Sequence, residues 1–338
     1  MHLIIPMAGQ GKRMRPHTLT TPKPLLPIAG QPMVTRLIEE IGAACDRPIQ
    51  TIGFVVSTLV PAVQTQLTEA AQQIGAQAKF YQQSQPRGTA HAVLCAQALL
   101  QGPVIVAFAD TLFKSTLTLA TKQESVIWVK KVPNPAAFGV VQRNAAGHVT
   151  AFVEKPDRFI SDLAIIGIYY FREGAHLAQA LQQLIDQDLQ RNGEYELTTA
   201  LEAMKAAGTQ FSTQEVDEWL DCGNKKAILH ANTRFLASLQ EDPSLIAPTA
   251  QVHNSILIPP VYLGAQAVIS NAVVGPYVSV GSYSRIEDAR VQHSLIQTHS
   301  TVKNVCAAHA MLGNHVQLIG QSPAISLGDY TTVAYEAS

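Results

Sequence analysis

Apolar and polar positions alternate in blocks from the N-terminus to about residue 220. Short apolar runs rich in β-branched residues predict buried strands at residues 52–57, 104–109, 126–129 and 164–171. Between several of these runs apolar residues recur at helical spacing, as at Val34, Leu37, Ile38 and Ile41 and again at Val93, Leu94, Ala98 and Leu99. This alternation predicts an α/β domain with a mostly parallel sheet covered by helices.

The pattern changes after a predicted helix at residues 225–239 and the break Glu241-Asp242-Pro243. Aliphatic residues then recur six apart, in the series Ile246, Val252, Ile258; Val268, Val274, Val280, Ile286; Ile296, Val302; and Leu312, Leu318. A six-residue repeat with glycine after several of the aliphatic residues predicts short strands stacked into a solenoid. The repeat slips near residues 260, 290 and 305, where we expect loops to protrude. The two patterns predict domains at residues 1–240 and 241–338.

Composition agrees with two domains and narrows the class of protein. The chain has 338 residues, more than one hydrophobic core usually serves. Its 24 Lys and Arg residues balance 25 Asp and Glu residues, which argues against nucleic acid or an acidic membrane as the main partner. No apolar run approaches the roughly 20 residues of a membrane span. The four scattered cysteines and the absence of a secretory signal pattern favour reduced thiols in a cytoplasmic protein.

The loop at residues 7–27 carries the strongest chemical signal. It follows a short apolar strand and contains Gly9, Gly11, Arg13 and, between two prolines, Lys23. Glycines let backbone amides approach a ligand closely, and nearby cations suit a polyanion such as a triphosphate. A third glycine of the dinucleotide fingerprint is missing, and no Walker Gly-Lys-Ser/Thr follows. A surface turn with solvated charges remains the alternative.

Two acidic residues follow apolar segments. Asp110 follows the strand at residues 104–109, and Asp221 ends the segment Trp219-Leu220-Asp221. Carboxylates at the carboxyl ends of buried strands face the ligand crevice of an α/β sheet and suit Mg²⁺, which takes few protein oxygens. Either residue alone could instead serve as a helix cap or turn former.

Two further segments suggest binding sites for a nucleotide base and for a sugar phosphate. Gln83 offers an amide that can contact a base edge, and Gly88 leaves room for a flat base against the backbone. Glu154 and Lys155 pair an acceptor with a cation at a strand end, which suits a sugar hydroxyl beside a phosphate. The alternative for the segment with Gln83 and Gly88 is an ordinary loop in which Thr89 caps a helix. The alternative for Glu154 and Lys155 is a surface salt bridge.

Taken together, these segments resemble the sugar-1-phosphate nucleotidyltransferases. Residues 7–27 are similar to the family loop A-G-G-x-G-T-R-L-x-P-x-T-x-x-x-P-K-x-x-x-P. The other matching segments follow in order: residues 83–90, the Asp110 strand, 138–140, 152–156, 167–169, 193–198 and 219–223. The repeats resemble the left-handed parallel β-helix of the long, glucose-1-phosphate thymidylyltransferase-like members. The resemblance implies a Rossmann-like nucleotidyltransferase domain followed by that β-helix of hexapeptide repeats.

The resemblance also implies a role for each matching residue. Gly9, Gly11 and Arg13 would hold the nucleotide phosphates, and Lys23 would lie near the α-phosphate. Gln83 and Gly88 would contact the base. Asp110 and Asp221 would hold Mg²⁺. The sugar phosphate would meet Gly139, Glu154, Lys155 and Tyr169, with Glu194 and Thr198 lining its pocket. Arg13, Lys23 and Asp110 are the expected catalytic residues. The loop departs from the family pattern at Gln10, where glycine is usual, and at Lys12, where threonine is usual.

The expected reaction joins a nucleoside triphosphate to a sugar 1-phosphate and releases pyrophosphate, with dTTP and glucose 1-phosphate as the first choice. UTP with glucose 1-phosphate and GTP with mannose 1-phosphate stay open. A second activity, acyl transfer by the β-helix, rests on His309 alone. An inactive regulatory subunit is disfavoured because Arg13, Lys23, Asp110 and Asp221 are all present. We expect the β-helix to support a homo-oligomer.

Overall fold

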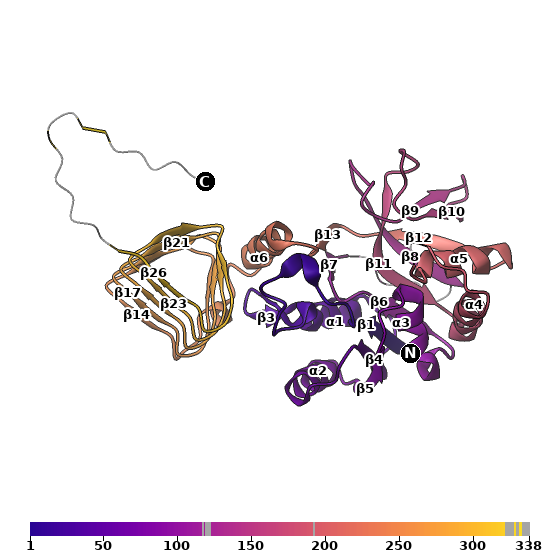
Figure 1. The fold of residues 1–338 in the computed structure, drawn as a ribbon, viewed down its shortest axis with the longest axis horizontal. Helices are drawn as coiled ribbons and strands as arrows, with labels where there is room; N and C mark the ends of the chain where they lie inside the picture. Colours follow the sequence, from indigo (N-terminus) through magenta and orange to yellow (C-terminus); the bar gives the residue numbers. More distant parts are fainter. Residues whose placement is uncertain (117, 119–122, 192, 322–327, 329–330, 333–338) are drawn as a thin grey trace. The chain divides into compact units, whose positions relative to one another are not determined.

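The computed structural model describes residues 1–116, 118, 123–191, 193–321, 328 and 331–332 (Figure 1). The chain divides into two compact units, Met1–Ala231 and Asn232–Ser338. The division lies inside helix α6 (Lys225–Ser238), whereas the sequence pattern placed the boundary after residue 240. The helix predicted at residues 225–239 is confirmed.

The first unit is built on a nine-stranded sheet. Its strands are β1 (His2–Pro6), β4 (Thr51–Val56), β5 (Gln77–Gln82), β6 (Val104–Ala107), β8 (Ser125–Lys131), β9 (Val140–Arg143), β10 (Val149–Val153), β11 (Leu163–Phe171) and β12 (Phe211–Glu215). The order is β10-β9-β11-β6-β1-β4-β5, with β8 paired to β11 and β12. The neighbours β6, β1, β4 and β5 are parallel, and β11 runs antiparallel to β6. The expected mostly parallel α/β sheet is confirmed, with antiparallel strands added on one side.

Helices pack on this sheet in two groups. One group contains α3 (Thr89–Cys95), α4 (Gly174–Asp186) and α5 (Leu197–Ala206), and the other contains α1 (Met33–Ala44) and α2 (Pro61–Gln73) (Figure 1). Ile4 of β1 lies in the core beneath the first group. Its neighbours Leu3 and Ile5 are equally buried, as expected for side chains on the opposite face of a strand covered on both sides. The helix expected through residues 93–99 ends at Cys95, and a 3₁₀ turn (Gln97–Leu99) follows.

A small antiparallel pair, β7 (Thr111–Lys114) and β13 (Glu218–Asp221), places the two acidic residues side by side. Strand β6 ends at Ala107, two residues earlier than predicted, and a turn leads directly into β7. Asp221 pairs with Thr111 in the register, and the amide of Cys222 donates to the carbonyl of Asp110 at 3.0 Å. The chain also forms the short strands β2 (Pro27–Ile28) and β3 (Gln31–Pro32).

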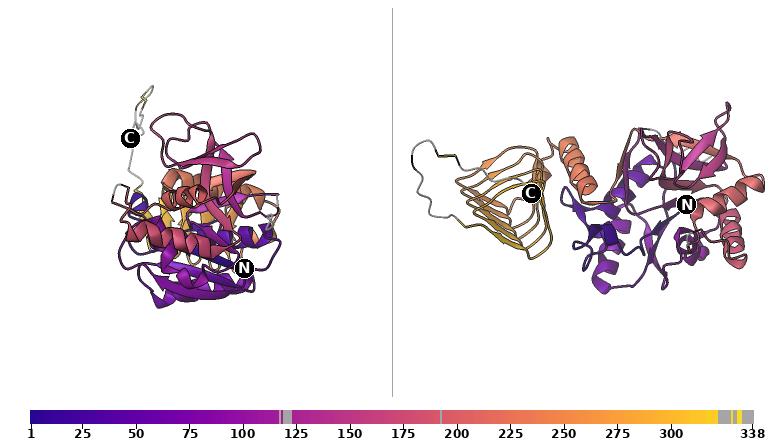
Figure 2. Two further views of the ribbon diagram at one scale, coloured as in Figure 1. Left: turned by 90° about the vertical axis from the view of Figure 1, so that its right-hand side faces the viewer. Right: turned by 45° about the horizontal axis from the view of Figure 1, so that its top comes forward.

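The second unit is a parallel β-helix of three stacked sheets, as expected (Figure 2). The first sheet contains β14 (Gln251–His253), β17 (Val268–Ser270), β20 (Arg285–Glu287), β23 (Thr301–Lys303) and β26 (Gln317–Ile319). The second contains β15 (Ile256–Leu257), β18 (Val273–Val274), β21 (Arg290–Gln292) and β24 (Cys306–Ala308). The third contains β16 (Val261–Leu263), β19 (Val278–Val280), β22 (Leu295–Ile296) and β25 (Met311–Leu312). Such sheets are typical of a left-handed β-helix.

The coils are shorter than three hexapeptides. Side chains on adjacent coils that bond to one another are 17 residues apart in the early coils, as in Asn254–Asn271, and 16 apart in the later ones, as in Lys303–Glu287. Ile269, fully buried, aligns with Ile286 in the interior, whereas the predicted Val268 is only half-buried. The expectation of protruding loops was wrong. The repeat slips because some sides of the coil are one residue short.

The corners of the coils carry ladders of side chains whose backbone has positive φ. One ladder is held by hydrogen bonds of 2.8 Å from Asn254 to Asn271 and 3.2 Å from Asn271 to Asp288. Two others are stacked rings, Tyr277–His293–His309 and Tyr283–His299–His315, with ring centroids 4.9 to 5.2 Å apart in successive pairs. Stacking across coils gives His309 a structural role.

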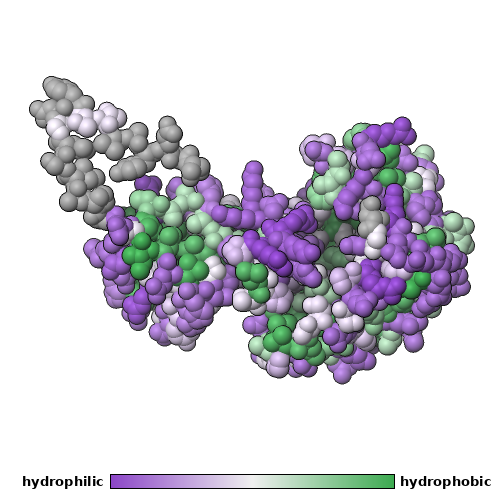
Figure 3. All heavy atoms as spheres, viewed as in Figure 1, coloured by the Kyte–Doolittle hydropathy of each residue, from purple (hydrophilic) through white to green (hydrophobic). Residues whose placement is uncertain are grey.

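Polar residues cover most of the visible surface of each unit, and apolar patches lie among these polar residues (Figure 3). Within the described part of the chain, no helix is long and apolar enough to cross a membrane.

Candidate active site

The glycine-rich loop leaves the carboxyl end of β1 and is held at both ends. Its first amide, that of Met7, donates to the carbonyl of Val55 at 2.8 Å, and the loop then enters a 3₁₀ turn (Lys12–Met14). Gly11 has φ +59°, and a Cβ there would lie 3.1 Å from Thr18 Cγ2. The Thr18 hydroxyl donates to the Gly11 carbonyl at 2.8 Å. The left-handed backbone and the close contact with Thr18 both favour glycine at this position of the loop.

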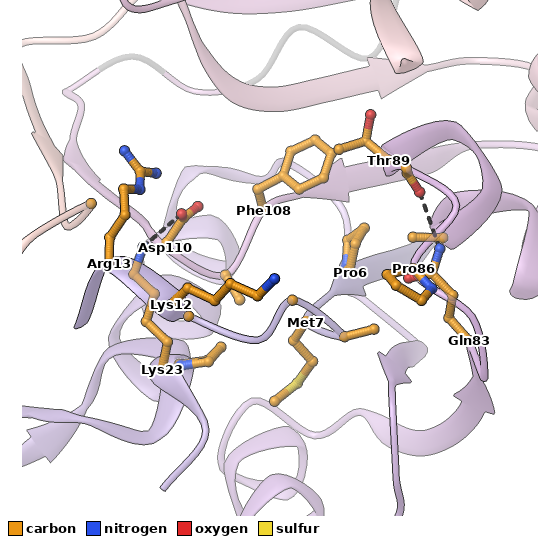
Figure 4. Close-up of a pocket in the computed structure, with 18 of the residues that line it drawn as sticks. Pro6, Met7, Lys12, Arg13, Lys23, Gln83, Pro86, Thr89, Phe108 and Asp110 are labelled. Carbon is orange, nitrogen blue, oxygen red and sulfur yellow. Dashed lines mark hydrogen bonds and ion pairs between the residues drawn. The ribbon is translucent and has the colours of Figure 1, made fainter. Parts of the chain in front are cut away.

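This loop forms one wall of a cavity of about 380 Å³ (Figure 4). The cavity is lined by these sequence-predicted residues: Gly9, Gly11, Arg13, Lys23, Gln83, Gly88 and Asp110. Lys12, one of the two departures from the family loop, also lines it. Lys12, Arg13 and Lys23 thus bring three cations to one cavity, which suits a polyanion.

Lys23 and Asp110 form an ion pair inside this cavity, with Nζ and Oδ2 2.8 Å apart. The two residues are 87 positions apart in the sequence. The side chain of Lys23 is only 10% exposed, against 40% for Asp110. A buried ammonium group needs such a partner, and the short charge-assisted bond fixes the direction of both side chains.

Asp110 and Asp221 form a carboxylate pair that fits Mg²⁺. Burial, and secondly the negative charge of Asp110, raise the pKa of Asp221 above its ordinary value. A cation between the two groups would relieve this repulsion. Asp221 lies behind Gly223, which lines the cavity: a Cβ on Gly223 would lie 3.1 Å from Asp221 Oδ2. No group of three or more His, Cys, Asp or Glu side chains gathers as a metal site among the described residues, so phosphate and water would complete the shell.

A second cavity of about 320 Å³ adjoins the first. It is lined by the residues predicted for the sugar phosphate: Gly139, Glu154, Lys155, Tyr169 and Thr198. The two cavities share four lining residues: Thr89, Phe108, Asp110 and Glu194. Asp110 therefore stands where a group bound in one cavity would meet a group bound in the other.

Among the charged residues that line the second cavity, carboxylates outnumber cations. Burial, and secondly the charge of Glu154, raise the pKa of both Tyr169 and Glu196. Lys155 is the cation beside them, with Nζ 3.7 Å from Glu154 Oε1. Carboxylates accept hydrogen bonds from hydroxyl groups, and a single cation suits one phosphate. The lining is thus suited to a polyhydroxylated molecule with one phosphate group.

The far end of the first cavity is formed by the start of α3. Gly88 has φ +103°, and a Cβ there would lie 2.5 Å from the Tyr195 carbonyl oxygen, so the backbone of Tyr195 itself requires glycine here. The alternative interpretation made Thr89 the N-cap of this helix, but Gly88 occupies that position. Thr89 Oγ1 instead accepts from the amide of Leu197 at 2.9 Å, at the first turn of α5. Thr89 therefore connects α3, which borders both cavities, to α5, which borders the second.

Three residues of the site were missed from the sequence. Phe108 lines both cavities and packs edge-on against Tyr169, with ring centroids 6.2 Å apart. The sequence feature that could have identified Phe108 is its position two residues before the candidate Asp110. Glu196 lines the second cavity, and His91 lies 3.0 Å from Gln83. His91 was assigned no role from the sequence.

The chain is similar in sequence and fold to several known proteins. Glucose-1-phosphate thymidylyltransferase of Streptomyces griseus is 28% identical across 98% of each chain. The bifunctional protein GlmU of Methanococcus vannielii is 29% identical over 71% of this chain and 56% of its own. A solved UDP-glucose pyrophosphorylase in complex with UDP-glucose superposes with a TM-score of 0.57 at 22% identity, covering 70% of this chain and 98% of its own. That likeness concerns the fold.

Residues 3–238 match the family described as nucleotidyl transferase. The matched range contains the loop, both acidic residues and both cavities. The chain therefore belongs to the nucleotidyl transferase family, and within it to the sugar nucleotidyltransferases.

Proposed function

We propose that this protein transfers a nucleotidyl group from dTTP to glucose 1-phosphate, giving a nucleotide sugar and pyrophosphate. The observation that carries the proposal is the pair of cavities that meet at Asp110, one lined by three cations and the other by carboxylates with one lysine. The choice of dTTP and glucose 1-phosphate is supported by the thymidylyltransferase of Streptomyces griseus, similar over nearly the full length of both chains.

The residues would act by alignment and charge neutralisation. A sugar-phosphate oxygen is already ionised at neutral pH, so its in-line attack on the α-phosphorus requires no general base. Lys23 would neutralise charge at the α-phosphate, and Arg13 with Lys12 would stabilise the pyrophosphate that leaves. Lys155 would hold the phosphate of the sugar, while Glu154 would accept from its hydroxyls. Phe108, shared by both cavities, would help to exclude water from the reacting atoms.

Asp110 and Asp221 would hold Mg²⁺, which supplies charge stabilisation to the phosphate oxygens when bound. The ion pair with Lys23 fixes the direction of the Asp110 carboxylate in the cavity. Lys23 would add its own positive charge to that of the bound metal. We therefore expect activity to require a divalent cation.

A pyrophosphate-release assay tests the proposal. The purified protein is incubated with Mg²⁺, each of five nucleoside triphosphates and each of several sugar 1-phosphates. We expect the highest turnover with dTTP and glucose 1-phosphate, none when either substrate is omitted, and complete loss with excess EDTA. If none of the tested pairs of substrates gives pyrophosphate, the proposal is refuted. A preference for UTP or GTP would correct the substrate and keep the reaction.

A further inference from the structure

Gln83, at the end of β5, makes two hydrogen bonds through the same atom. Its Nε2 donates to the carbonyl of Gly88 at 3.1 Å and lies 3.0 Å from Nδ1 of His91 (Figure 4 draws the first). A backbone carbonyl only accepts, so the bond to Gly88 fixes which end of the amide is nitrogen. Both amide hydrogens are then occupied by acceptors. The side chain is 6% exposed and lines the first cavity.

The bond to His91 also fixes the state of the imidazole. Because Gln83 is the donor, Nδ1 of His91 must be unprotonated, and the ring is neutral with its proton on Nε2. Burial, and secondly the positive charge of Arg87, lower the pKa of His91, which keeps the ring neutral at pH 7. The other titratable group close to Nδ1 is the Cys95 thiol at 4.0 Å, whose pKa is raised by burial.

The remaining polar atom of the side chain is Oε1. No described residue donates to it, and it belongs to a side chain that lines the cavity predicted for the nucleotide. Resting on the proposed function, we propose that His91 and the Gly88 carbonyl hold Gln83 as a pure acceptor toward the base, so that the site selects bases with a ring N–H. His91 is then a positioning residue that acts through Gln83.

This arrangement divides the five nucleotides into two classes. Thymine and uracil present N3–H, and guanine presents N1–H, so each can donate to Oε1. Cytosine N3 and adenine N1 are acceptors and would place a lone pair against Oε1. A site built around a hydrogen bond rejects an analogue that lacks the partner strongly. We expect kcat/KM to be at least about 100-fold lower for CTP and ATP than for the preferred nucleotide.

Substitutions of His91 test the positioning role. Asn places an acceptor near the position of Nδ1 and takes up no proton between pH 5 and 8, whereas Leu offers no acceptor. We expect His91→Leu to raise KM for the preferred nucleotide about 10-fold and to reduce discrimination against CTP about 10-fold, with kcat within about threefold. His91→Asn should keep both values within about threefold of the wild type. Cys95→Ala, one helical turn away, is the matched control and should change neither.

The pH profile supplies a test on the unaltered protein. As pH falls through the lowered pKa of His91, Nδ1 becomes a donor and can no longer hold Gln83. Discrimination between UTP and CTP should therefore fall at acid pH in the wild type and stay constant in His91→Asn. A ratio that falls equally in both proteins would overturn the role of His91.

Direct binding separates this inference from the proposed function. Binding of UTP, dTTP, GTP, CTP and ATP is measured by calorimetry alongside turnover, so a protein without pyrophosphate release still reports its base preference. Tight binding of CTP or ATP, or unchanged discrimination in a folded His91→Leu variant, would contradict the inference. Absence of turnover with the expected base preference would refute only the proposed reaction.

Discussion

The two units of this protein use side chains in opposite ways. In the α/β unit, the groups at the centre of the site come from distant parts of the sequence: Lys23 and Asp110 are 87 positions apart, and Thr89 bonds to Leu197 across 108 positions. In the β-helix, side-chain contacts between coils repeat every 16 or 17 residues. The α/β unit brings site residues together from distant segments, whereas the β-helix repeats the same side-chain contacts from coil to coil.

This difference separates activity from stability. The regular elements of the α/β unit form its core, while the charged residues of the first cavity lie on loops that the core positions. A change in the cavity should therefore affect turnover more than folding. In the β-helix each coil rests on the next, so a change in one coil should affect folding and leave the chemistry intact.

The largest effect is expected from Asp110→Asn and Arg13→Ala. Each removes a charge at the junction or wall of the two cavities, and loss of one preorganised group in such a site lowers kcat about 100-fold or more. Arg13→Ala should change the free energy of unfolding by less than about 1 kcal/mol. Asp110→Asn also removes the charged partner of the buried Lys23 and should lower it by about 1 to 3 kcal/mol. Pyrophosphate release and chemical denaturation measure the two quantities. Asp162→Asn, an exposed carboxylate outside both cavities, is the control, and near-normal turnover of either variant would refute the assigned roles.

Gly275→Ala should have the largest effect in the β-helix. Gly275 has φ +115°, and a Cβ there would lie 1.9 Å from the carbonyl oxygen of Ile258 on the neighbouring coil. Strain and overlap of this kind cost about 3 kcal/mol of folding free energy. We expect a lower unfolding midpoint by thermal scanning, with kcat of the folded protein unchanged within about twofold. The exposed substitution Gln317→Ala serves as the control. A large loss of kcat at full folding would show that the β-helix contributes to the chemistry.

Lys155→Ala should affect binding of one substrate only. Lys155 lines the second cavity and is mostly exposed, so its loss should raise KM for the sugar phosphate about 10-fold. KM for the nucleotide and kcat should stay within about threefold. Steady-state kinetics with each substrate varied in turn provide the test, with the exposed Lys131→Ala as control. An equal rise in both KM values would show that the two cavities are not separate substrate sites.

The smallest effect is expected in the corner ladder of the β-helix. Asn271 has φ +47° and joins Asn254 and Asp288 by hydrogen bonds. Asn271→Ala should lower the free energy of unfolding by about 1 kcal/mol, since it loses these exposed bonds and strains the left-handed backbone. Asn271→Gly removes the bonds and relieves the backbone, so comparing the two by denaturation separates the causes. Equal stability of Asn271→Ala and the wild type would mean that the ladder does not contribute to the free energy of unfolding.

Much of the architecture was accessible from the sequence because burial repeats locally. The strand at residues 104–109 and the helix at 225–239 were predicted within two residues of their ends. The change of period marked the start of the β-helix. All the candidate site residues except Asp221 line one of two adjoining cavities. Their roles remain predictions.

The sequence by itself determined which segments are buried, where the period changes and which residue types gather at strand ends, because these depend on neighbours within one turn or strand. Tertiary structure decided the rest. The coil length depends on register between coils, so Ile269 rather than Val268 faces the interior. The need for Gly88 comes from the backbone of Tyr195, and the partner of Lys23 is chosen by packing across the sheet. Contacts between distant segments leave no periodic trace, and only the folded chain reveals them.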